Sequence, residues 1–128
     1  ILTWIADRTP ALAPSGPLGR YRLIEMLSFI AAEIHKRFPI FLFAPDAAKL
    51  MLREQIGHWL DHVAARLTGE YLFGNSFSTV DAYLFVMARG AAELGFTLPA
   101  ALSDYVARID ARPMVREALR REKAGTGG

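Results

Sequence analysis

Apolar residues near the start of the chain recur at steps of three and four positions, the spacing of one face of an α-helix. This stripe predicts a helix over residues 20–38. Pro39 is expected to end that helix, because proline lacks an amide donor and disfavours a helical residue before it. Residues 40–44 are then expected to form a short apolar connection. The stripe consists of Leu23, Leu27, Ile30, Ile34 and Phe38.

The same spacing predicts a second helix, which opens at Pro45 and Asp46 and runs to about Leu67. A third helix is expected after residues 74–77. Its start has the Ser-x-x-Asp spacing of a capping box, in which side chains satisfy free backbone amides at the helix start. The capping residues are Gly74, Ser78 and Asp81.

The third helix continues through the unbroken apolar run 82–88, which predicts a helix buried nearly all round at the centre of the fold, with Tyr83 in the core. Gly95 is expected to end it. Pro99 opens a fourth helix to about Arg112, and Pro113 opens a fifth. No period-two pattern of strands appears, so the prediction is an all-α bundle of about five helices.

Composition narrows the classes of function. Apolar residues make up 52% of the 128 residues, which excludes intrinsic disorder and suggests apolar surface covered by a partner domain or subunit. The absence of cysteine excludes disulfides, cysteine-based zinc sites and a thiol nucleophile within the chain. A net charge of +2 does not indicate a nucleic-acid partner. No apolar run is long enough to span a membrane, so no membrane partner is expected.

Three segments together resemble the C-terminal helical domain of cytosolic glutathione transferases. Residues 74–82, Gly-Asn-Ser-Phe-Ser-Thr-Val-Asp-Ala, are similar to the family's capping-box and hydrophobic-staple motif. Residues 111–119, Ala-Arg-Pro-Met-Val-Arg-Glu-Ala-Leu, are similar to its Arg-Pro ending. Residues 29–38 contain a His-Lys pair that resembles the first long helix of the bacterial beta class.

The resemblance implies a domain layout. Residues 1–7 correspond to the end of the last helix of an N-terminal thioredoxin-like domain, and the Pro- and Gly-rich residues 8–19 to the interdomain linker. Residues 20–123 correspond to the helical domain, and 124–128 to a disordered tail. The thioredoxin-like domain, with its catalytic Cys, Tyr or Ser, is absent from these residues.

The resemblance also implies an activity. The intact protein is expected to be a cytoplasmic homodimeric enzyme that uses glutathione as co-substrate and needs no metal. It would conjugate glutathione to small hydrophobic electrophiles, or reduce them, whereas these 128 residues alone are expected to be inactive. The alternative is a non-catalytic module of the same fold that binds a partner protein; a His-Lys pair and an apolar pocket argue against that alternative.

Candidate glutathione contacts follow from the beta-class match. His35 lies on the flank of the first stripe, where it would donate to the glutathione sulfur; its alternative is a partly buried histidine bonded to backbone. Lys36 would contact the anionic ligand or complement the negative end of its helix. Ser28 stands where relatives often carry a glutathione-facing Asn. Glu33 would reach the ammonium of glutathione in a neighbouring subunit, or is an ordinary exposed glutamate.

The electrophile pocket is expected from the same match. Gly90 stands where bacterial members often place a Trp, which should open or reshape the pocket. Four aromatic residues are expected as its walls: Phe38, Phe41, Phe43 and Tyr105.

One further pattern suits metal binding. His58 and His62 are one helical turn apart, with Glu54 a turn earlier. No other ligand cluster accompanies them, so a solvated helix face is the favoured interpretation.

Overall fold

The computed structural model describes residues 1–125, and this part of the chain is helical with no β-strand beyond an isolated bridge between Tyr71 and Gly74. The predicted all-α class is therefore confirmed. The helices are α1 (Leu2–Arg8), η1 (Pro10–Leu12), α2 (Gly19–Phe29), η2 (Ile30–His35), α3 (Arg37–Phe43), α4 (Asp46–Ala64), α5 (Thr79–Glu93), α6 (Ala100–Asp110) and α7 (Pro113–Gly125).

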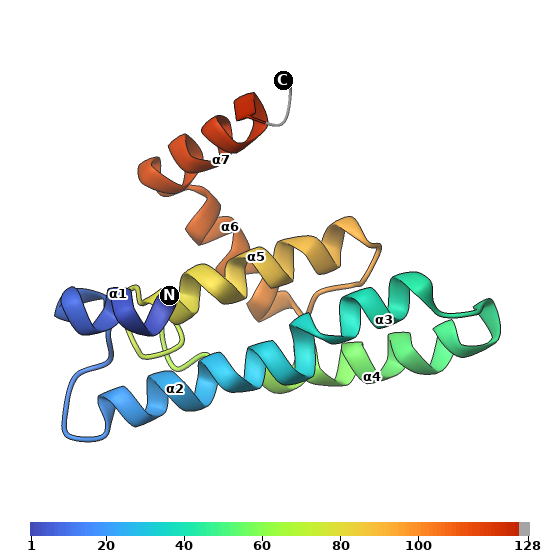
Figure 1. Cartoon of the computed structure of the whole chain (residues 1–128), viewed down its shortest axis with the longest axis horizontal. Helices are drawn as coiled ribbons and strands as arrows, with labels where there is room; N and C mark the ends of the chain where they lie inside the picture. The colour runs from blue at the N-terminus through green and yellow to red at the C-terminus, as the bar shows by residue number, and fades with distance from the viewer. Residues whose placement is uncertain (126–128) are drawn as a thin grey trace.

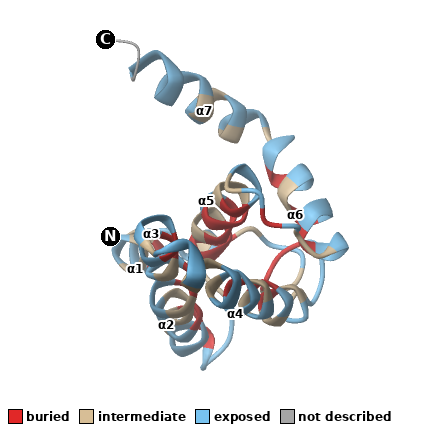
Figure 2. Cartoon of the chain, turned by 90° about the vertical axis from the view of Figure 1, so that its right-hand side faces the viewer, coloured by how far each residue is buried: buried red, intermediate tan, exposed pale blue. Residues whose placement is uncertain are grey.

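Helix α5 is the centre of the arrangement. It contacts α1, α2, η2 and α6, while α2, η2 and α3 form one long rod beside α4 (Figure 1). Buried residues gather on α5 and on the faces turned toward it, and α7 projects away with no buried residue of its own (Figure 2). Fully buried side chains such as Leu23, Leu60 and Leu84 fill this core. None of the helices described is both long and apolar enough to cross a membrane.

The prediction that Pro39 ends the first long helix was wrong. At η2 the chain makes a π-helical turn, in which the Lys36 amide donates to the carbonyl of Ala31, five residues earlier, at 3.1 Å. Helix α3 then begins afresh at Arg37, so Pro39 falls in its first turn. Amides of a first turn have no partner within the helix, so a proline costs little there. The expected connection 40–44 is therefore helical as far as Phe43.

Helix α5 departs from the predicted burial on one side only. Val80, Leu84 and Ala88 are fully buried, as expected for a central helix, but Val86 is 56% exposed. Its side chain lies on the face of α5 that the other helices leave uncovered. The helix ends at Glu93, before Gly95, whose φ of +79° suits glycine.

The ends of the second and last long helices also differ from the sequence-based bounds. Helix α4 ends at Ala64 rather than at Leu67. Helix α7 continues to Gly125, so the first two residues of the tail predicted for 124–128 are helical. Residues 126–128 lie outside the described part.

Substitution by alanine should have opposite effects on stability at two glycines. At Gly19, where α2 begins, an added Cβ would clash with the backbone carbonyl oxygen of Pro14, so G19A should destabilise the fold by about 1–3 kcal/mol. At Gly57, within α4, a Cβ would meet nothing within 4 Å, so G57A should stabilise by up to about 1 kcal/mol. Urea unfolding measures both changes. Equal stability of the two variants would contradict the close approach at Gly19.

Candidate functional site

His35 ends the π-helical turn and is exposed to solvent. Its Nδ1 lies 2.8 Å from the hydroxyl oxygen of Tyr83 on α5, and the two rings meet edge to face with centroids 5.8 Å apart. Burial raises the pKa of Tyr83 above its usual value, so its hydroxyl keeps its proton. One ring nitrogen of His35 is thus occupied by the protein, and the other is left for a ligand.

The other predicted glutathione contacts lie along the same rod of α2, η2 and α3. Ser28 and Lys36 are exposed. Glu33 instead forms an ion pair with Arg37, whose Nη2 lies 2.6 Å from its carboxylate. Arg37 also donates to Gln55 of α4 at 3.3 Å, which directs this pair toward α4.

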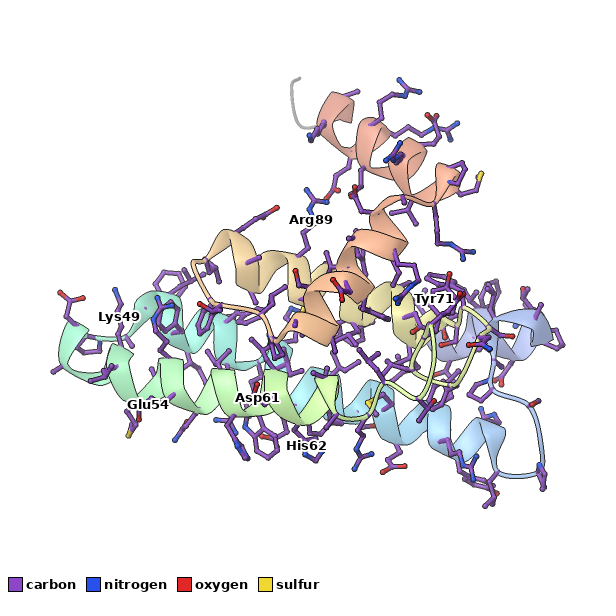
Figure 3. The ribbon with its side chains drawn as sticks, turned by 180° about the vertical axis from the view of Figure 1, so that it is seen from behind. Lys49, Glu54, Asp61, His62, Tyr71 and Arg89 are labelled. Atoms are coloured by element: carbon purple, nitrogen blue, oxygen red, sulfur yellow. The ribbon has the colours of Figure 1, made fainter. Side chains whose placement is uncertain are left out.

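A hollow of about 410 Å³ opens between α3, α5 and α7. Phe38, Val86 and Met87 form its apolar wall, and Gly90 lies in its lining. A Cβ at Gly90 would meet nothing within 4 Å, so the glycine leaves this space open. Arg89, which projects from α5 toward α7 (Figure 3), pairs with Glu93 at 3.2 Å beside the hollow.

Of the four aromatic residues predicted to wall the pocket, Phe38 alone lines this hollow. Phe41 is buried against Phe96, with ring centroids 5.1 Å apart. Phe43 is 88% exposed at the far end of α3. Tyr105 is completely buried in the core, where its hydroxyl donates to the carboxylate of Asp81 at 2.9 Å. Phe41 and Phe43 therefore lie elsewhere on α3, and Tyr105 belongs to α6 and the core rather than to this hollow.

Asp81 anchors the start of α5. Its carboxylate, fully buried, accepts hydrogen bonds from the Ser78 amide at 2.8 Å, the Ser78 hydroxyl at 2.7 Å and the Leu72 amide at 3.0 Å, besides that of Tyr105. Burial and the Asp81 carboxylate raise the pKa of Tyr105, which keeps its hydroxyl a donor. Gly74, with φ of +95°, closes the loop before it through a 2.8 Å bond from the Tyr71 amide. The capping box is thus present and extends to α6.

Tyr83 is the site residue that the sequence pattern missed, because it lies in an apolar run interpreted as core. The available signal was its hydroxyl, since a tyrosine packed among apolar residues usually needs a hydrogen-bond partner.

The histidine pair lies on α4, and the ring of His62 also packs against Phe29 of α2, with centroids 5.2 Å apart. Glu54 and His62 lie along the edge of α4 that faces away from α5 in Figure 3. The rings of His58 and His62 pack against Trp59, with centroids 5.2 and 5.8 Å from it. Across residues 1–125, no three His, Cys, Asp or Glu side chains are placed to hold a metal ion.

Comparison with known proteins identifies relatives of this chain. The chain is 35% identical to glutathione S-transferase GstA of Escherichia coli O157:H7 over 130 residues, 95% of the chain. Its fold matches a beta-class glutathione S-transferase of Sphingomonas chungbukensis over 94% of the chain, with 42% identity and a TM-score of 0.80. The chain is homologous to bacterial glutathione S-transferases of the beta class.

A sphingomonad glutathione S-transferase, solved in complex with glutathione, also matches 95% of the chain, with 42% identity and a TM-score of 0.81. The chain spans about 65% of the length of these glutathione S-transferases. No protein-family model matches the chain. The matches confirm the resemblance to the helical C-terminal domain of glutathione S-transferases.

Proposed function

We propose that the chain is the helical half of an enzyme that joins glutathione to small hydrophobic electrophiles, or reduces them. The observation that carries this proposal is His35, an exposed imidazole held by Tyr83 through one nitrogen while the other is free for a ligand. A sphingomonad glutathione S-transferase that is similar to this chain was solved in complex with glutathione, which supports the choice of co-substrate.

The chemistry proposed for His35 is stabilisation of a thiolate. A thiolate is a far better nucleophile than a thiol, and hydrogen-bond donors or cations beside the sulfur favour it. The free ring nitrogen of His35 would donate to the sulfur, and Lys36 would add positive charge nearby. In a substitution the thiolate sulfur forms a bond to the electrophilic carbon, and the leaving group departs with the bonding electrons.

The hollow beside Phe38 is the proposed place for the electrophile. Its wall of Phe38, Val86 and Met87 suits an apolar molecule, and Gly90 leaves the space open. The pair Arg89–Glu93 keeps the rim polar.

Two partners complete the proposal. A thioredoxin-like domain would cover α1, where Trp4 is 57% and Ile1 97% exposed, with residues 1–7 as the end of its last helix and 8–19 as the linker. A second subunit of a cytoplasmic homodimer would cover the outer face of α2 and α4. Exposed apolar side chains there include Tyr21, at 70%, and Leu50, at 70%.

Chromatography on immobilised glutathione tests the division of labour between the two domains. The intact protein with its thioredoxin-like domain should be retained and eluted by free glutathione. The 128 residues alone should pass through and turn over no electrophile, because the residues proposed here contact only one side of the ligand. Retention of the isolated chain would contradict this division. An intact protein that neither binds glutathione nor conjugates it would instead favour the non-catalytic module.

A further inference from the structure

The contact between His35 and Tyr83 fixes more than the position of the imidazole. A neutral imidazole carries one proton, on either Nδ1 or Nε2, and its hydrogen bonds decide which. Tyr83 is half-buried, and burial raises the pKa of its hydroxyl, which therefore stays protonated. Across the 2.8 Å contact either atom could donate, but a phenol O–H is a stronger donor than a neutral imidazole N–H, and the bare imidazole nitrogen is the stronger acceptor. The favoured hydrogen bond therefore runs from the Tyr83 hydroxyl to Nδ1.

The consequence lies at the opposite nitrogen. With Nδ1 accepting from Tyr83, the proton of a neutral His35 resides on Nε2, which faces away from α5. The ring therefore presents an N–H donor to solvent, and not an acceptor. A thiolate sulfur needs a donor, so the tautomer selected by Tyr83 is the useful one.

His35, one partner in this contact, is the last residue of the π-helical turn. The bond from the Lys36 amide to the Ala31 carbonyl spans five residues, so η2 contains more residues per turn than an α-helix. The extra residue rotates His35 relative to a regular helix, and η2 packs directly on α5, which carries Tyr83. Such turns recur at functional sites, where they redirect a side chain.

We propose that Tyr83 is a positioning residue, which fixes the orientation and the Nε2–H tautomer of His35 so that this N–H meets the sulfur of glutathione. The inference rests on the proposed function for the sulfur, whereas the tautomer itself is a property of the chain alone. Tyr83 acts through His35 and does not touch the reacting atoms.

Nitrogen-15 NMR of the chain at a pH where His35 is neutral tests the tautomer. In the unmodified chain, long-range spectra should show His35 protonated at Nε2, with Nδ1 in the range of a hydrogen-bond acceptor. In Tyr83→Phe the same spectra should show a mixture of tautomers and a ring in exchange. Ser103→Ala, which removes a hydroxyl from an exposed residue of α6, should leave the His35 signals unchanged. A proton on Nδ1 in the unmodified chain, or identical His35 signals in Tyr83→Phe, would overturn the inference.

Kinetics of the intact protein tests the consequence. Tyr83→Phe should lower kcat for conjugation about three- to tenfold, the effect of one hydrogen bond, and raise the pH at which bound glutathione ionises. Ser103→Ala should change neither. A changed tautomer with unchanged kcat would overturn the positioning role and leave the proposed function standing. A wild-type protein without any conjugation would refute the proposed function itself, and the NMR result would still decide the tautomer.

Discussion

Asp81→Ala should reduce the free energy of unfolding by about 3 kcal/mol or more. The substitution leaves the amides of Leu72 and Ser78 and the hydroxyl of Ser78 without their acceptor, while the Tyr105 hydroxyl keeps only the backbone carbonyl of residue 81, at 3.2 Å. Each stranded buried donor costs about 1–3 kcal/mol, and the site is closed to water because Asp81 is completely buried. One side chain thus joins the preceding loop, the start of α5 and the middle of α6.

Chemical denaturation followed by circular dichroism measures this loss. The matched control is Asp104→Ala, an exposed aspartate on α6, which should change stability by no more than about 0.5 kcal/mol. Tyr105→Phe removes one donor to the Asp81 carboxylate, and its loss of stability should fall between those of Asp81→Ala and Asp104→Ala. Equal stabilities of Asp81→Ala and Asp104→Ala would show that the buried carboxylate does not hold the elements together.

His35→Ala should slow conjugation of a chlorinated aromatic electrophile by the intact protein about tenfold or more. A hydrogen bond to a charged group contributes about 1.5–3 kcal/mol, and the substitution removes the donor proposed for the thiolate. The loss should appear in kcat and kcat/KM measured at saturating glutathione, while the fold is retained because the side chain is exposed.

His58→Ala provides the control for that measurement. It makes the same chemical change at an exposed histidine on α4, and should leave the rate within about twofold. An unchanged rate and unchanged glutathione affinity in His35→Ala would refute the role given to this residue.

Features of the fold that depend on residues close in sequence were predictable, whereas features that depend on contacts between helices were not. The capping box at Ser78 and Asp81 was predictable because it involves residues three apart in sequence. The continuation of the first rod through Pro39 was not, because it depends on a π-helical turn packed against α5. Proline lacks an amide donor, which ends a helix in its interior but costs little in a first turn. The sequence alone does not show which of these positions Pro39 occupies.

The site was predictable in part for a related reason. The flank of the helical stripe predicted exposure of His35, and the structure places it there. The sequence pattern does not show which aromatic residues line a pocket. Phe38 lies beside a hollow and Tyr105 in the core, yet both occupy apolar positions of a helical stripe. Tyr83 was missed because its partner lies 48 residues away, and periodicity within one helix cannot report a contact between helices.

The central claim is that His35 of this helical domain stabilises the thiolate of bound glutathione. Ultraviolet absorbance of the thiolate, followed as a function of pH in the intact protein saturated with glutathione, measures it directly. A donor at the sulfur lowers the pKa of the thiol, so His35→Ala should move the ionisation of bound glutathione upward by about one to two pH units. An ionisation at the same pH in the unmodified protein and in His35→Ala would contradict the claim.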